Sequence, residues 1–188
     1  MKEEAVARLL RAYPWLEGPA SAGHPALAGC EEVNWSGIHG CPAGVPLVLR
    51  ALLDDTGGPE ALRALDCVTM DSPLHIGGAM PAVLPFVIRL AADPGLVVRK
   101  GLIELVVFAA MISEPDESDA ADTGGGLGEP LGPMDRDRRE RAACRAAFAA
   151  HAPEVHALLA DPGLTDPLLS ADDRAWLLKA VEWERAPS

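Results

Sequence analysis

A sequence pattern recurs along this chain of 188 residues. The segment VPLVLR at 45–50 is matched by LPFVIR at 84–89, and in both copies an aspartate follows the proline by eight residues. The segment ADPGL at 92–96 returns unchanged at 160–164, where Pro153 again lies eight residues before the aspartate. A period of about 40 residues is typical of helical repeats that stack side by side.

Each copy of the pattern predicts two helices joined by a turn. Proline suits the first turn of a helix because its φ is fixed and its missing N–H is not needed there, so Pro46, Pro85 and Pro153 are predicted to begin helices. The Asp-Pro-Gly or Asp-Asp-Thr-Gly-Gly that follows ends the helix in a tight turn. After two of the turns apolar residues return at helical spacing, as Ala61, Leu62, Leu65 and Val68 and as Leu102, Leu105, Val106 and Ala109.

The repeat predicts an all-α fold, namely a short right-handed α-solenoid of about three HEAT- or armadillo-like helical hairpins with an N-terminal capping helix. Residues 1–188 are expected to form a single domain. Within it, 1–32 hold the capping helix and an irregular lead-in, 33–112 hold two repeats, 113–133 form an acidic, Gly-rich disordered loop, and 134–188 hold the C-terminal helices.

The apolar spacing sets the helices expected outside the two repeats. An amphipathic helix is predicted over 3–17, at the open end of the stack. Three more are predicted over 135–150, 153–160 and 171–183, and Ser170 has the side chain of an N-cap for the last of them.

The charge of the chain favours a protein partner over nucleic acid or a membrane surface. There are 28 Asp and Glu residues against 16 Lys and Arg, for a net charge of −12, and this charge opposes approach to phosphate backbones and anionic bilayers. Residues 1–112 carry −4 and residues 113–188 carry −8, so a basic partner is expected at the C-terminal part. No apolar run approaches the ~20 residues of a membrane span, and we expect a cytoplasmic protein.

Four cysteines are expected to be reduced thiols because the N-terminus lacks an export signal. Together with two histidines they supply zinc-type ligand atoms, but their spacing does not match a zinc knuckle. We therefore predict no metal, no cofactor and no catalytic residue. The alternative is a small metalloprotein or Cys/His enzyme with a site near the inter-repeat turn, drawn from Cys30, His39, Cys41, Cys67 and His75.

Two tryptophans of the last predicted helix, Trp176 and Trp183, lie seven residues apart and so share a face. That face either closes the core or forms an exposed aromatic stripe for a partner. If the stripe is exposed, it can join two copies of the chain, so the expected state is a monomer or a homodimer.

The segment VNWSGIHGCPAGVP at 33–46, together with VLPFVIRL at 83–90, resembles a group of actinobacterial HEAT-repeat proteins. Trp35, Ser36 and Gly44 fit the opening of that pattern, and the resemblance covers roughly residues 33–112. It implies a binding scaffold without catalysis, found in some cases as a small immunity partner beside a toxin gene.

These observations predict a non-catalytic protein-binding protein, and within that class they favour an immunity protein or inhibitor that occludes the basic cleft of a nuclease-like toxin. The residues expected to contact the partner are Trp35, His39, His75, Glu114, Asp116, Glu117, Asp119 and Asp122.

Overall fold

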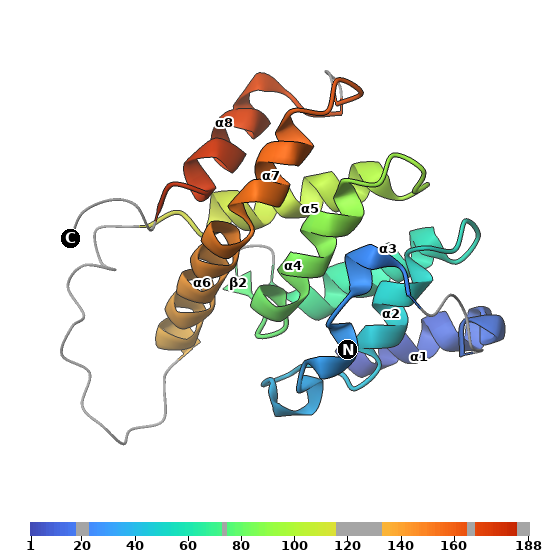
Figure 1. Cartoon of the computed structure of the whole chain (residues 1–188). Helices are drawn as coiled ribbons and strands as arrows, with labels where there is room; N and C mark the ends of the chain where they lie inside the picture. Colours follow the sequence, from blue (N-terminus) through green and yellow to red (C-terminus); the bar gives the residue numbers. More distant parts are fainter. Residues whose placement is uncertain (18–22, 73–74, 116–132, 165–167, 184–188) are drawn as a thin grey trace.

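The fold is predominantly α-helical, as predicted, with one small antiparallel sheet (Figure 1). The computed structural model describes residues 1–17, 23–72, 75–115, 133–164 and 168–183, without the side chains of 133–136. Its α-helices are α1 (Lys2–Ala12), α2 (Val45–Ala51), α3 (Gly58–Thr69), α4 (Met80–Ala91), α5 (Arg99–Ile112), α6 (Pro133–Ala150), α7 (Ala152–Leu159) and α8 (Ala171–Ala180). Short 3₁₀-helices are η1 (Pro14–Glu17), η2 (Pro25–Leu27), η3 (Cys30–Glu32) and η4 (Trp35–Gly37), and the strands are β1 (Met70–Ser72) and β2 (His75–Ile76).

The repeat prolines begin two of the three helices predicted for them. Pro46 and Pro153 lie in the first turns of α2 and α7, which confirms both predictions. The prediction for Pro85 is wrong, because α4 begins at Met80 with Pro81 in its first turn and Pro85 lies inside the helix. An interior proline removes one backbone hydrogen bond. The apolar residues on both sides of Pro85 are buried, and this burial stabilises the longer helix.

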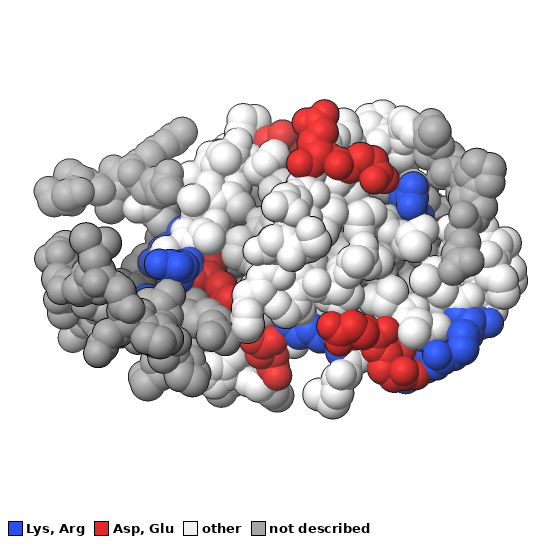
Figure 2. All heavy atoms as spheres, turned by 90° about the horizontal axis from the view of Figure 1, so that it is seen from below, with Lys and Arg blue, Asp and Glu red and all other residues white. Residues whose placement is uncertain are grey.

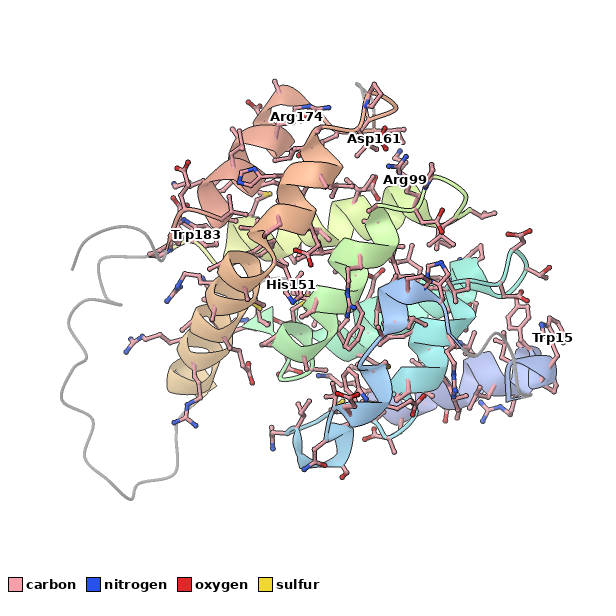
Figure 3. All side chains as sticks on the ribbon, viewed as in Figure 1. Trp15, Arg99, His151, Asp161, Arg174 and Trp183 are labelled. Atoms are coloured by element: carbon pink, nitrogen blue, oxygen red, sulfur yellow. The ribbon has the colours of Figure 1, made fainter. Side chains whose placement is uncertain are left out.

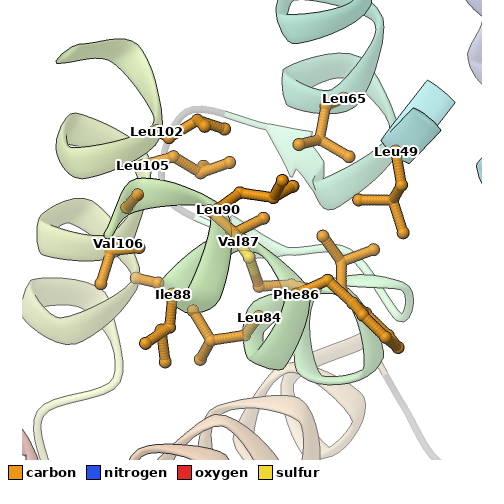
Figure 4. Packing of buried hydrophobic residues seen from close by; sticks show 14 of the residues in the cluster. Leu49, Leu65, Leu84, Phe86, Val87, Ile88, Leu90, Leu102, Leu105 and Val106 are labelled. Carbon is orange, nitrogen blue, oxygen red and sulfur yellow. The ribbon is translucent and has the colours of Figure 1, made fainter. Parts of the chain in front are cut away.

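The helix α4 lies at the centre of the molecule. It packs against α5, α6, α7 and η2, and Figure 4 shows its side chains between those of neighbouring helices. Most of the helix surface is covered, and the partly exposed Pro81, Ala82, Pro85 and Arg89 share the remaining side. Its buried residues are Met80, Val83, Leu84, Phe86, Val87, Ile88, Leu90 and Ala91.

The three repeat aspartates close the same kind of turn. In each, the Oδ1 oxygen accepts a backbone N–H two or three residues ahead, which is the hydrogen bond that makes aspartate a turn residue. The sequence repeat therefore has a structural counterpart in the turns that end α2, α4 and α7. The three bonds join Asp54 to Gly57 at 2.6 Å, Asp93 to Gly95 at 2.8 Å and Asp161 to Gly163 at 2.7 Å.

The second carboxylate oxygen of each repeat aspartate reaches a residue far away in the sequence. The partners of the Oδ2 atoms are Trp15 Nε1 for Asp54 at 3.4 Å, His24 Nε2 for Asp93 at 3.3 Å, and the Arg99 guanidinium for Asp161. One carboxylate thus shapes its own turn and also fixes a neighbouring element. In Figure 1 the three turns lie along one edge of the molecule, which we call the turn edge.

The ion pair at Asp161 predicts how the stability of the folded state depends on pH. The Arg99 guanidinium and the Gly163 N–H lower the pKa of Asp161 below its usual value of 3.8. The folded state therefore gains stability from this carboxylate above about pH 4 and loses it as the pH falls further. Asp161→Asn is expected to lower the urea midpoint at pH 6, and the difference from the wild type should shrink toward pH 3. Asp55→Asn, in an exposed turn position, is the matched control. If the difference in urea midpoint between Asp161→Asn and the wild type does not depend on pH, the ionised Asp161 carboxylate is not the stabilising group.

The other predicted elements differ from the structure mainly at their ends. The first helix ends at Ala12 rather than at residue 17, and η1 follows it from Pro14. The helix α8 begins after Ser170, whose side chain forms a capping box with Asp173, as its N-cap prediction requires. The β1–β2 hairpin was not predicted. Most of the predicted loop, residues 116–132, lies outside the described residues.

Candidate functional site

Trp35, predicted to contact a partner, is instead part of the core. Its side chain is 6% exposed, its Nε1 donates to the Cys30 carbonyl at 2.9 Å, and its ring packs against Phe86 at a centroid distance of 6.1 Å. Trp35 has an amphipathic ring and lies in a Gly-rich segment, and it was predicted to lie at the surface. The structure corrects that prediction, because the buried N–H has an internal acceptor and the ring fills space beside α4.

The structure brings several of the predicted Cys and His residues to one region, around Lys2 of α1. Lys2 Nζ pairs with Asp71 Oδ1 of β1 at 2.6 Å, and a side-chain Cβ at Gly40, next to His39, would lie 3.9 Å from the same Nζ. A pocket of about 660 Å³ opens here, and we call it the Lys2 pocket. It is lined by Met1, Lys2, Glu3, Gly40, Asp66, Cys67, Met70, Asp71 and Ser72.

The two predicted histidines are exposed at this end of the molecule. His75 Nδ1 and Ser72 Oγ lie 2.7 Å apart across the β1–β2 hairpin. His39 lies in the loop after η4, and its carbonyl would be 2.6 Å from a Cβ at Gly78. Both residues are thus placed at the surface, as a partner-binding role requires, and that role remains a prediction.

The Cys41 thiol, next in sequence to Gly40 of the Lys2 pocket, is not an activated nucleophile. Burial raises its pKa and holds it in the protonated form. Partial burial and repulsion from Glu104 raise the pKa of Asp66 to about 6, although part of this side chain is exposed. Across the described ranges no three His, Cys, Asp or Glu side chains are arranged to hold a metal ion. Nothing observed there favours the metalloprotein or Cys/His enzyme alternative.

The four cysteines are free thiols, as predicted. Cys30 and Cys144 are buried, and burial raises the pKa of Cys30 to about 11 and that of Cys144 to about 12. Such thiols behave as small apolar side chains. Cys67 is the exposed one and lies in the wall of the Lys2 pocket.

The arginine-rich start of α6 is tied to the hairpin. Asp137 accepts the Ile76 N–H at 3.0 Å through Oδ1 and the Arg141 Nε–H at 2.8 Å through Oδ2. This Asp–Arg contact spans one helical turn, the spacing at which opposite charges pair on a helix surface. The same carboxylate also holds β2, a role that the sequence did not predict.

Trp176 and Trp183 have different surroundings. The Trp183 ring packs edge-on against the buried Phe148 at a centroid distance of 6.3 Å, so it belongs to the core (Figure 3). Trp176 is half-buried, and Lys179 Nζ lies 5.1 Å from its ring centroid. The pair is therefore not one exposed aromatic stripe.

Only one of the five acidic residues predicted to bind a partner is described. Glu114 is partly exposed just after α5 and pairs with Lys179 of α8. Asp116, Glu117, Asp119 and Asp122 lie outside the described residues.

The turn edge carries two exposed apolar side chains that the sequence did not single out. Trp15 is 54% exposed and Val97 is 63% exposed. They flank the turn between α2 and α3, because a Cβ at Gly57 would lie 3.2 Å from Leu16 and one at Gly58 would lie 3.2 Å from Val98. These contacts place the segments of Trp15 and Val97 each beside the α2–α3 turn.

Trp15 is held in place although most of its ring faces solvent. Its Nε1 donates to Asp54 Oδ2 at 3.4 Å, and the Tyr13 ring stands perpendicular to it at a centroid distance of 5.3 Å. Figure 3 shows Trp15 at the margin of the molecule. A fixed, exposed tryptophan loses little conformational entropy when a partner covers it. The one available sequence signal was Pro14, which ends α1 and turns the next residue away from the helix.

On the face shown in Figure 2, charged side chains lie around a broad area of uncharged side chains, and several acidic groups adjoin basic ones. None of the described helices is long and apolar enough to cross a membrane.

Comparison with family models, with curated proteins and with solved structures gives no match for this chain.

Proposed function

We propose that this chain is a non-catalytic protein-binding protein, built as a short right-handed α-solenoid of three helical hairpins. The hairpins are α2–α3, α4–α5 and α7–α8, and α1 packs on α3 as the cap. The observation that carries the proposal is the threefold use of Asp54, Asp93 and Asp161 at the turns. In all three turns one carboxylate oxygen shapes the turn and the other holds a distant residue, although that residue differs from turn to turn, and this recurrence supports a stack of related units.

The turn edge is the surface through which we expect binding. Trp15 and Val97 are large apolar side chains exposed beside one turn, and tryptophan is enriched among the residues that dominate binding energy. Carboxylates of the turns lie along the same edge, with Asp55 exposed and Asp93 and Asp161 partly exposed. Exposed apolar side chains in a row with carboxylates suit a partner that has an apolar pocket beside Lys or Arg.

The charge of the whole chain supports a basic partner. A net charge of −12 speeds association with a positively charged protein and keeps the chain away from nucleic acid. Within this class we propose an immunity protein or inhibitor, acting in the cytoplasm, that covers the basic cleft of a nuclease-like toxin. The resemblance of residues 33–112 to actinobacterial HEAT-repeat proteins, some of them immunity partners, points the same way.

Tandem purification of the tagged chain from its native host tests the proposal. We expect one basic protein in stoichiometric amount, whose recovery falls as salt is raised because surface charges are screened. Expression of the chain should also protect cells from the product of a neighbouring toxin gene. Recovery of no stoichiometric partner, together with no protection, would falsify the proposal.

A further inference from the structure

A second pocket, of about 520 Å³, lies between the segment 23–31 and the end of α2. It falls within the roughly 300–1,000 Å³ range of small-molecule sites. The pocket combines an apolar wall with one guanidinium, and we call it the Arg50 pocket. Its lining residues are Gly23, His24, Pro25, Leu27, Ala28, Cys30, Glu31 and Arg50.

The wall of the Arg50 pocket is fastened to the helical body at both ends and in the middle. His24 pairs with Asp93 at 3.3 Å, and the Cys30 carbonyl accepts the Trp35 indole N–H at 2.9 Å. Between them the Ala28 carbonyl accepts two hydrogen bonds from Arg89, at 3.1 and 3.2 Å. The segment is therefore held open as a fixed surface, and a ligand need not order it.

Arg50 is a cation available to a ligand in this pocket. Its side chain is 37% exposed, and its hydrogen-bond partner within the described part of the chain is Glu31, from NH1 to Oε1 at 3.4 Å. That distance is long for a charged pair, and Glu31 is 73% exposed, so solvent competes with the contact. Arg89, in contrast, has its guanidinium committed to the Ala28 and Pro85 carbonyls.

We infer that the Arg50 pocket binds a small carboxylate with an apolar body. The carboxylate would replace Glu31 on the planar guanidinium, which matches a carboxylate through two parallel N–H groups. The apolar body would lie against Pro25, Leu27 and Ala28. This site adjoins the turn edge through the His24–Asp93 pair, but it does not depend on the proposed protein partner.

Titration of the full chain with hexanoate, followed by amide NMR, tests this inference. We expect saturable shifts in residues 24–31 and at Arg50, with a dissociation constant on the order of 1 mM for so small a ligand. Hexanamide, which keeps the body and loses the charge, should bind roughly tenfold more weakly, and acetate should bind more weakly as well.

Three variants distinguish a specific contact of hexanoate with Arg50 from a general attraction to positive charge. Arg50→Met should weaken hexanoate binding roughly tenfold or more, whereas Glu31→Gln should strengthen it by roughly two- to fivefold because the competing carboxylate is gone. Arg63→Met removes an exposed arginine of α3 and should leave binding unchanged. The same spectra report whether each variant is folded.

Three results would each overturn the inference. The first is that hexanoate shifts no amide resonance at concentrations roughly tenfold above 1 mM. The second is that hexanamide and hexanoate bind equally well. The third is that the hexanoate shifts map to the Lys2 pocket instead.

Discussion

Replacing Leu84 by alanine is expected to lower the free energy of unfolding by about 3 kcal/mol, within the range of about 2–5 kcal/mol seen for buried Leu→Ala changes. Leu84 is fully buried on α4, and α4 packs against helices from both halves of the chain. Because α4 packs against several helices and Leu84 belongs to the buried cluster around it, the truncation would leave a cavity inside the core (Figure 4).

Urea unfolding followed by circular dichroism measures this loss. The matched control is Leu178→Ala, since Leu178 is 44% exposed on α8 and its truncation should change stability by less than about 0.5 kcal/mol. A single transition is expected in both variants because α4 links the two halves. Equal effects of Leu84→Ala and Leu178→Ala would show that α4 is not the centre of the core.

The second large effect is expected on partner binding. Trp15→Ala combined with Val97→Glu should weaken binding of the basic partner by at least about 2 kcal/mol, or roughly 30-fold in affinity. The change removes the exposed side chains of Trp15 and Val97 from the turn edge and places a carboxylate at position 97. Calorimetric titration of the purified partner measures the loss, and the urea midpoint of the double variant shows that it remains folded.

The control for this prediction uses equally exposed apolar residues on another part of the surface. Met111 and Leu178 are 42% and 44% exposed on α5 and α8. Met111→Ala combined with Leu178→Glu should leave partner affinity within a factor of about two. Loss of affinity in this control, with none in the turn-edge variant, would move the binding surface to the α5–α8 face.

Much of the helical frame could be predicted because it follows from local chemistry. Proline at the first turn, aspartate before a glycine turn and apolar residues at helical spacing act over a few residues, and each has the same meaning in every copy. Asp54, Asp93 and Asp161 are the clearest case, since their turns are formed as expected.

Three features could not be predicted because they depend on tertiary packing. Pro85 lies inside α4 because the apolar residues that flank it are buried, and no local rule reports that burial. Trp35 is buried because the Cys30 carbonyl and Phe86 meet its ring. The β1–β2 hairpin pairs very few residues and is supported by Asp137 from α6, 61 residues from Ile76.

The turn-edge surface could not be predicted either, because the exposure of Trp15 also depends on tertiary contacts. Trp15 lay in a segment predicted to continue the first helix, where an aromatic residue is expected to pack. Its exposure depends on the end of α1 at Ala12 and on the bond to Asp54, which is 39 residues away. The acidic residues that the sequence favoured fall mostly outside the described residues, and their role remains a prediction.

Hydrogen–deuterium exchange on the complex with the basic partner tests most directly where this chain binds. The account predicts slower amide exchange on complex formation in residues 13–17, 54–58 and 93–98, with no change in residues 105–112 and 171–180. Protection confined to residues 105–112 and 171–180, or no protection at the turn edge, would contradict it.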